Sequence, residues 1–192
     1  MDLTFVLNKV HTLFLSRKKG VFIPSTSSVF FRSSTICKPI SYKNGGKIII
    51  GNNIRIGRSP KGYHGGMPFP SSLLADGSGA SIVLGDNCRI NGAYIHAEES
   101  ITIGNNCVIA SGVNIIDSNG HEVSSLDRTN SRDIPKGISI GNNVWIGLNA
   151  TVLKGTIIGD NSVIGAGVVV KGHISANSLV SNLTPETKSI QF

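Results

Sequence analysis

His121 is the residue whose position most clearly predicts acid–base chemistry. A sixfold count of aliphatic residues through positions 103, 109 and 115 would place another at 121, and a histidine stands there instead. An imidazole at that point must leave an apolar core, and it can take a proton from an alcohol or an amine near neutral pH. We interpret His121 as a general base. The alternative is an ordinary solvated loop histidine.

Two carboxylates and the single tryptophan are candidates to assist His121. Asp117 and Glu122 flank the same turn, and a carboxylate bonded to the imidazole would fix its tautomer. We expect one of the two to have this orienting role, although either is equally compatible with an ordinary surface acid. Trp145 directly precedes Ile146, a core position of the repeat, so its indole is expected to face outward. There the N–H can stabilise negative charge that develops on a carbonyl oxygen.

Other kinds of catalytic site have no recognisable pattern in this sequence. A Ser-His-Asp or Cys-His nucleophile is not evident, and Cys107 occupies a repeat position that points into the core. The histidines at positions 64, 96, 121 and 173 lack the spacing of a zinc site. We therefore expect no metal and no covalent acyl-enzyme.

A six-residue repeat must position these residues. Aliphatic side chains recur at every sixth position in the second half of the chain, at Ile140, Ile146, Val152, Ile158, Ile164 and Val170. A second phase, four residues further on, holds Val144, Ala150, Thr156, Ser162, Val168 and Ile174. A period of six fits neither an α-helix nor a simple strand, and it is typical of short β-helix repeats. With three hexads to a turn, the aliphatic residues stack inward as columns.

The first half of the chain follows the same count less regularly. Its positions are Ile50, Ile56, Leu84, Ile90 and, after a seven-residue step, Ala97, Ile103, Ile109 and Ile115. Gly-Asn-Asn or Gly-Asp-Asn follows several of them, starting at positions 51, 85, 104, 141 and 159. These residue types tolerate left-handed backbone, so they predict the corners of a coil.

The count divides the chain into three segments. Residues 1–45 are expected to form an N-terminal helix and cap, residues 46–176 the β-helix domain, and residues 177–192 a C-terminal tail. The count is lost near 59–80 and 116–137, which predicts two loops ejected from the coil. Residues 2–19 have helical spacing and a basic end. That helix is expected to cap the coil or pack on a partner; contact with an anionic membrane surface is the alternative.

Bulk properties limit the class of protein. The chain has 192 residues and a formal net charge of +7, which favours anionic partners such as phosphates or acidic polysaccharide. A basic block interleaved with aromatic residues is missing, so nucleic acid is not the expected partner. The three cysteines have no CxxC spacing, and neither a signal peptide nor a membrane-spanning stretch is apparent. These features predict a cytoplasmic protein with reduced thiols.

Three stretches resemble the left-handed β-helix hexapeptide-repeat acyltransferases. They are Asp117-Ser118-Asn119-Gly120-His121, then Ile138 to Gly147, then Ile158 to Gly167. The resemblance covers roughly residues 46–176. Within that family, the sequence is similar to the branch that holds maltose and galactoside O-acetyltransferases and the enzymes that O-acetylate capsule and O-antigen sugars, including polysialic acid. The resemblance implies an all-β fold, a left-handed parallel β-helix, with acetyl-CoA as co-substrate and assembly as a homotrimer.

The resemblance also assigns residues to roles. His121 matches the general base, and Trp145 matches the indole beside the thioester. Asn91 lies near the position of an asparagine that contacts the acceptor. The residues matching the cofactor-binding positions are Gly147, Ala166, Gly167 and Lys171.

The function predicted is an acetyl-CoA-dependent O-acetyltransferase that acts on a hydroxyl of a carbohydrate, a surface polysaccharide or its precursor. An N-acetyltransferase acting on an amino-sugar nucleotide or another small amine is the first alternative. A non-catalytic solenoid that serves as a scaffold is the second, although it would not need a histidine that breaks the repeat.

Overall fold

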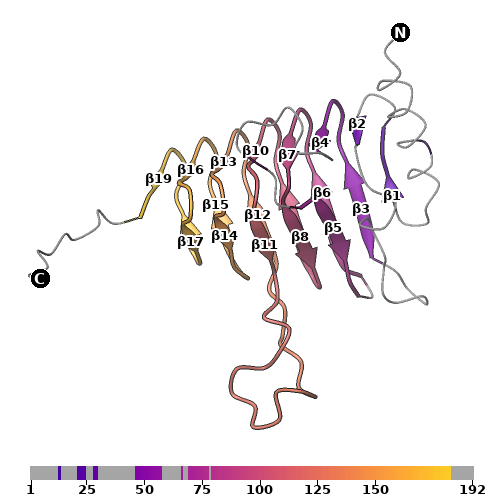
Figure 1. Cartoon of the computed structure of the whole chain (residues 1–192), viewed down its shortest axis with the longest axis vertical. Helices are drawn as coiled ribbons and strands as arrows, with labels where there is room; N and C mark the ends of the chain where they lie inside the picture. Colours follow the sequence, from indigo (N-terminus) through magenta and orange to yellow (C-terminus); the bar gives the residue numbers. More distant parts are fainter. Residues whose placement is uncertain are drawn as a thin grey trace, which may run out of the picture.

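The computed structural model describes residues 13, 21–24, 28–29, 46–57, 66, 69–77 and 79–182. Within this part the chain winds as a parallel β-helix with three sheets (Figure 1). All strand pairs between neighbouring coils are parallel, which confirms the all-β repeat fold. The predicted helix over residues 2–19 lies outside the described residues, apart from Leu13.

Among the described residues, each coil contributes one strand to sheet A and one to sheet B, and the five central coils also contribute one to sheet C. Sheet A holds β1 (Val21–Phe22), β3 (Lys47–Ile50), β6 (Ser81–Leu84), β9 (Ser100–Ile103), β12 (Ile138–Ile140), β15 (Ile157–Ile158) and β18 (His173–Ile174). Sheet B holds β2 (Ser28–Val29), β4 (Arg55–Gly57), β7 (Arg89–Asn91), β10 (Val108–Ile109), β13 (Trp145–Ile146), β16 (Val163–Ile164) and β19 (Leu179–Val180). Sheet C holds β5 (Ser72–Ala75), β8 (Tyr94–Ala97), β11 (Asn114–Ile116), β14 (Thr151–Val152) and β17 (Val169–Val170).

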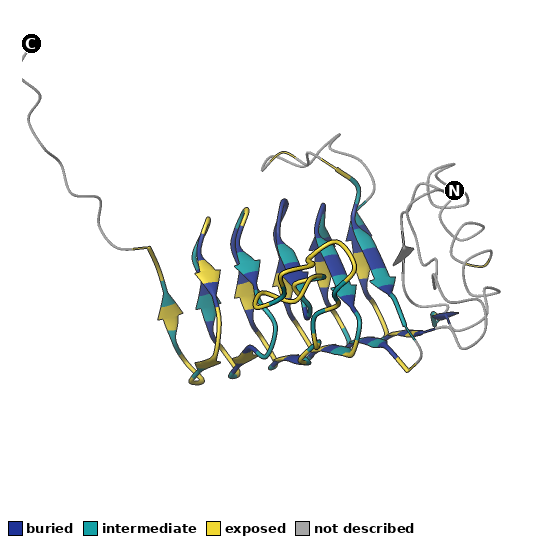
Figure 2. Cartoon of the chain, turned by 90° about the horizontal axis from the view of Figure 1, so that it is seen from below, coloured by how far each residue is buried: buried dark blue, intermediate teal, exposed yellow. Residues whose placement is uncertain are grey.

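The core consists of columns of aliphatic side chains, as the repeat predicted. The six residues of the first phase are at most 4% exposed, and Figure 2 shows buried positions alternating with outward ones along the strands. Register places Ile109, Ile146 and Ile164 in one column of sheet B. Each column buries apolar area that one coil alone would leave exposed, so neighbouring coils stabilise one another.

The first half differs from the sixfold count in sheet C. Ile95, and not Ala97, shares a column with Leu73 and Ile115. The reason is strand length: β8 has four residues and buries two of them, Ile95 and Ala97, whereas the later strands of sheet C bury one each. A count that tracks one inward residue per strand therefore changes phase where two are buried.

The predicted corners are confirmed at the edge between sheets A and B, here called the first edge. Asparagine adopts a positive φ in six successive coils, at Asn53, Asn87, Asn106, Asn143, Asn161 and Asn177. Side-chain amides also link coils, for example from Asn143 Nδ2 to Asn161 Oδ1 at 3.0 Å. The asparagines therefore relieve backbone strain and join neighbouring turns.

The coil extends beyond the limits expected from the sequence. β1 and β2 precede residue 46, and β19 follows residue 176. Within the expected loop near 59–80, residues Ser72–Ala75 form β5, with Leu73 and Ala75 pointing inward. Its serine and small residues concealed the apolar alternation. From 117 to 137 the chain forms no strand and projects away from the coil (Figure 1).

Candidate active site

The loop that carries His121 begins and ends at the edge between sheets C and A, here called the third edge. Lys136 N–H donates to the Asp117 carbonyl at 2.8 Å, and Gly155 N–H donates to the Lys136 carbonyl at 2.8 Å. These bonds continue the ladder of neighbouring coils across the base of the loop. Residues 118–135 are therefore an insertion into the coil.

Asp117 ties the start of the loop to the preceding coil. Its side chain is fully buried, and its carboxylate accepts hydrogen bonds from the backbone N–H groups of Glu98, Glu99 and Ser100 at 2.7, 2.9 and 2.8 Å. Burial raises the pKa of Asp117, while the three N–H donors oppose that rise. Asp117 thus closes the corner between β8 and β9.

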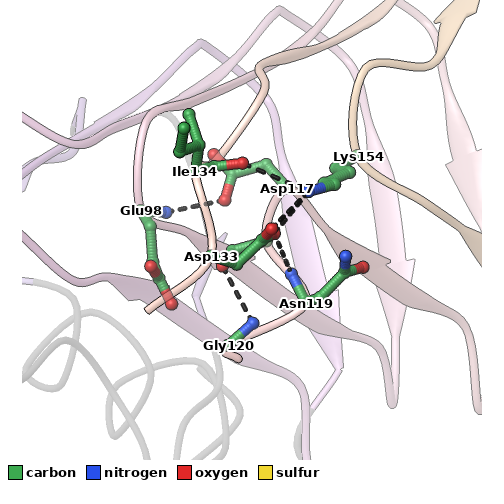
Figure 3. A network of polar contacts seen from close by, with 8 residues as sticks. Glu98, Asp117, Asn119, Gly120, Asp133, Ile134 and Lys154 are labelled. Atoms are coloured by element: carbon green, nitrogen blue, oxygen red, sulfur yellow. Dashed lines mark hydrogen bonds and ion pairs between the residues drawn. The ribbon is translucent and has the colours of Figure 1, made fainter. Parts of the chain in front are cut away.

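A second carboxylate ties the far side of the loop to the following coil. Asp133 binds the Lys154 ammonium at 2.5 and 2.6 Å and accepts the Asn119 N–H at 2.8 Å (Figure 3). Lys154 also donates to the Ile134 carbonyl at 3.2 Å. The Lys154 ammonium and the Asn119 N–H hold the pKa of the Asp133 carboxyl below its usual range. This network fixes the backbone two residues before His121.

The Asp133–Lys154 ion pair predicts that wild type and Lys154→Met differ in thermal stability by an amount that depends on pH. Because the pKa of Asp133 is depressed in the folded chain, the pair stabilises the protein above the unfolded pKa of about 3.9 and loses that effect as pH falls through the folded value. The melting temperature of Lys154→Met should be lower than wild type at pH 7, and the gap should close as Asp133 becomes protonated. Thermal unfolding from pH 7 to pH 2 measures this gap; a constant gap would contradict the assignment.

His121 is an exposed residue of the loop, and its ring has one defined hydrogen bond. Its Nδ1 is 2.5 Å from the Arg128 carbonyl oxygen. A carbonyl oxygen accepts hydrogen bonds but does not donate them, so Nδ1 must carry the proton. In the neutral ring, Nε2 then has the lone pair. The Arg128 guanidinium donates to the Val123 carbonyl at 3.1 Å, which closes the same turn. Nε2, the nitrogen that can accept a proton, is therefore on the side of the ring away from the hydrogen bond to the Arg128 carbonyl.

The acceptor at the histidine is therefore a backbone carbonyl, and the two expected carboxylates are engaged elsewhere. Asp117 binds the N–H groups of the preceding coil, and the Glu122 carboxylate accepts the Ser124 hydroxyl at 2.9 Å. The physical reason is the local shape of the loop, which folds Arg128 back over His121. A backbone group has no sequence signature, so residue types could not reveal this partner.

The remaining predicted residues other than Lys171 lie on sheet B or on the edge between sheets B and C, here called the second edge. Trp145 is 54% exposed on β13, and Asn91 ends β7 in the same sheet. Gly147 stacks on the next coil so closely that an added Cβ would lie 2.7 Å from Ala166 N. Gly167 N–H donates to the Leu148 carbonyl across the same two coils at 2.7 Å. The structure thus brings Gly147, Ala166 and Gly167 together.

The predicted residues form two separate groups in one chain. His121, Asp117 and Glu122 belong to the third edge, as does the exposed Lys171 between β17 and β18. Trp145 points outward from sheet B, which is the face opposite that edge of the prism. Figure 1 shows the loop extending away from the stacked strands. One chain therefore carries the predicted residues in two groups, on different sides of its coil.

Neither the Asp133–Lys154 pair nor the contact of the Arg128 carbonyl with His121 was predicted from the sequence. Opposite charges 21 residues apart are a weak signal, because an irregular loop has no fixed register. Within the described residues, no group of three or more His, Cys, Asp or Glu side chains is arranged to hold a metal ion. A helix with the length and apolar character needed to cross a membrane is likewise absent from the part of the chain that the structure describes.

Comparison with known proteins identifies the family. A sequence profile described as "Hexapeptide repeat of succinyl-transferase" matches residues 82–116 and 137–171. The chain is 34% identical over 167 residues to the "Putative lipopolysaccharide biosynthesis O-acetyl transferase WbbJ" of Escherichia coli K12, covering 81% of this chain and 78% of that protein. It is 39% identical over 106 residues to the galactoside O-acetyltransferase of the same organism, covering 55% and 52%.

A solved structure is consistent with these relatives. The hexapeptide-repeat acetyltransferase VCA0836 of Vibrio cholerae, crystallised with acetyl coenzyme A, superposes with a TM-score of 0.50 at 28% identity, covering 57% of this chain and 61% of that one. With the parallel coil, the turn pattern and the match to most of WbbJ, the chain belongs to the left-handed β-helix hexapeptide-repeat acetyltransferases, enzymes that use acetyl-CoA.

Proposed function

We propose that this enzyme transfers an acetyl group from acetyl-CoA to a hydroxyl of a carbohydrate, a surface polysaccharide or its precursor, with His121 as general base. The bond from His121 Nδ1 to the Arg128 carbonyl carries the proposal, because it fixes the tautomer in which Nε2 accepts a proton. The O-acetyltransferase relatives, and their roles in lipopolysaccharide and galactoside acetylation, support the choice of a sugar hydroxyl.

The reaction is a direct displacement within a ternary complex. Nε2 of His121 takes the hydroxyl proton as the oxygen attacks the thioester carbonyl carbon, forming a C–O bond. The indole N–H of Trp145 stabilises the negative charge on the carbonyl oxygen. The C–S bond then breaks, and the CoA sulfur receives the proton from the imidazolium. Gly147, Ala166, Gly167 and Lys171 are assigned to CoA, and Asn91 to the acceptor.

The site is completed by a second copy of the chain, in a homotrimer. Its support is the separation of the His121 loop from the outward face of sheet B. The loop exposes Val123, Leu126 and Ile134, which are 70, 105 and 83% accessible. Burying these side chains against a neighbour would stabilise the assembly. The loop of one chain would then present His121 beside Trp145 of the next.

We place the enzyme in the cytoplasm and residues 46–176 at the centre of its catalytic domain. Cys88 and Cys107 are buried free thiols, which fits a reducing compartment, and acetyl-CoA is available there. A role in making capsule or O-antigen follows from the same proposal.

Acetyl-CoA consumption, measured against neutral and acidic sugars, nucleotide sugars and oligosaccharides, tests the proposed reaction. The product should lose its acetyl group in mild alkali, because esters hydrolyse readily under these conditions. An alkali-stable product would identify an amide and favour the N-acetyltransferase alternative. Absence of acetyl-CoA-dependent product with every sugar would contradict the proposal.

Trp145→Ala should lower kcat/KM by roughly 100-fold, because it removes both a wall of the site and an oxyanion donor. Trp145→Phe keeps most of the ring area and loses the N–H, so it separates the two effects. Both variants should fold, since Trp145 is 54% exposed in the isolated chain. Steady-state kinetics with the best acceptor provide the measurement. If Trp145→Ala has the same kcat/KM as wild type, Trp145 is not part of the site.

A further inference from the structure

Two arginines occupy neighbouring positions in the outward row of sheet B. The register runs from Arg55 to Arg89, then to Val108 and Trp145. Both arginines are exposed, and the ion pairs found among the described residues involve neither of them. Like charges directly opposite one another on paired strands are destabilising. A bound anion would remove that cost.

This pair lies on the acceptor side of Trp145. Arg89 is two strands from Trp145 in the same row, about 10 Å at the usual strand spacing. Asn91, assigned above to the acceptor, follows Arg89 by two residues and lies on the same outward face of β7. Gly147, Ala166 and Gly167, assigned to CoA, lie on coils at or beyond Trp145 in the opposite direction along the coil.

We infer that Arg55 and Arg89 bind a carboxylate of the acceptor, so the preferred substrate is an acidic oligosaccharide or polysaccharide. A guanidinium forms paired hydrogen bonds with a carboxylate, and two guanidinium groups one strand apart suit one carboxylate or two successive acidic sugars. An extended acceptor would follow the row from Arg55 towards Trp145 and place a hydroxyl at the reacting centre. This inference rests on the proposed function and adds the charge of the substrate.

The experiment compares Arg55→Gln, Arg89→Gln and the double variant with Lys47→Gln. Lys47 is also an exposed cation, but it lies on sheet A, so the control removes the same charge from another face. Acceptors are uronic acid and sialic acid oligomers, and the methyl esters of the same oligomers, which keep the sugar ring and lack the charge. KM is measured for each acceptor and for acetyl-CoA, at low and high salt.

Wild type should prefer at least one acidic oligomer to its methyl ester, and salt should weaken that preference. Arg89→Gln should raise KM for the acidic oligomer at least tenfold, as expected for losing a hydrogen bond between charged groups. The double variant should show a larger increase. Neither substitution should change KM for the ester or for acetyl-CoA, and Lys47→Gln should behave as wild type. A rise in KM for acetyl-CoA would assign the pair to the donor and overturn the inference, as would arginine variants that match Lys47→Gln.

Calorimetric titration of His121→Ala with the same oligomers separates this inference from the proposed chemistry. This variant should bind the acidic oligomer and lose most of that affinity when Arg55 and Arg89 are also replaced. Binding of this kind without turnover in wild type would support the acidic site and reject the proposed reaction. If the acidic oligomers bind no better than their esters, the inference is wrong even where acetyl transfer occurs.

Discussion

Replacing His121 by alanine should reduce kcat by about 10²–10⁴-fold, the usual contribution of a positioned general base. The fold should be unchanged, because the exposed ring contacts the loop itself through the Arg128 carbonyl and contributes nothing to the aliphatic columns. KM for acetyl-CoA should change little, since the donor is assigned to Gly147, Ala166 and Gly167. Pre-steady-state and steady-state acetyl transfer give these constants.

A matched control for His121→Ala lies in the same loop. Glu122→Gln removes a carboxylate that contacts the Ser124 hydroxyl, and it should retain wild-type kcat. Circular dichroism and chain-association measurements on both variants establish that the coil and assembly persist. Unchanged turnover in His121→Ala would remove the general base from the mechanism.

Asp117→Ala should be the most destabilising single change in the loop region. It leaves three backbone N–H groups, those of Glu98, Glu99 and Ser100, without their acceptor. The three bonds are part-buried, so each unsatisfied donor is expected to cost about 1 kcal/mol, the low end of the range for buried groups, and the loss should be about 3 kcal/mol. Asp117→Asn keeps the shape but turns an amide donor towards a backbone donor, so it should be destabilised to a smaller extent. Urea unfolding measures both free energies.

Asp127→Asn is the control for Asp117. Asp127 lies at the exposed end of the same loop, where its carboxylate accepts bonds from Thr129 and Asn130. Its replacement should leave the free energy of unfolding unchanged within error. Equal effects of the two substitutions would show that Asp117 does not anchor the loop to the preceding coil.

The coil could be predicted because each turn repeats the same packing constraint. Every inward position faces the same constraint, an aliphatic side chain above and below, so Ile140, Ile146 and Val152 together predict the fold. The corner asparagines are predictable for the same reason, since each coil needs a left-handed residue at the first edge. The inward position of Ile95 and the strand β5 were harder to predict, because longer strands bury two residues each and shift the sixfold count.

The loop was predictable in position but not in internal structure. A histidine that breaks the count at 121 marks a departure from the core, whereas the bond that orients it comes from a backbone carbonyl at Arg128. Asp117 was recognised as a special acid, yet its structural use depends on which N–H groups the preceding coil exposes. Irregular segments have no period, so contacts such as Asp133 with Lys154 emerge from three-dimensional packing.

Co-expression of His121→Ala and Trp145→Ala chains is the most direct measurement of whether two copies share each site. Every chain then carries one defect, so a site built within one chain stays impaired. In randomly mixed trimers with shared sites, about one quarter of the sites would combine an intact His121 with an intact Trp145. Acetyl transfer should therefore recover to about a quarter of wild type. Activity no higher than the mean of the two variants alone would contradict a site shared between chains.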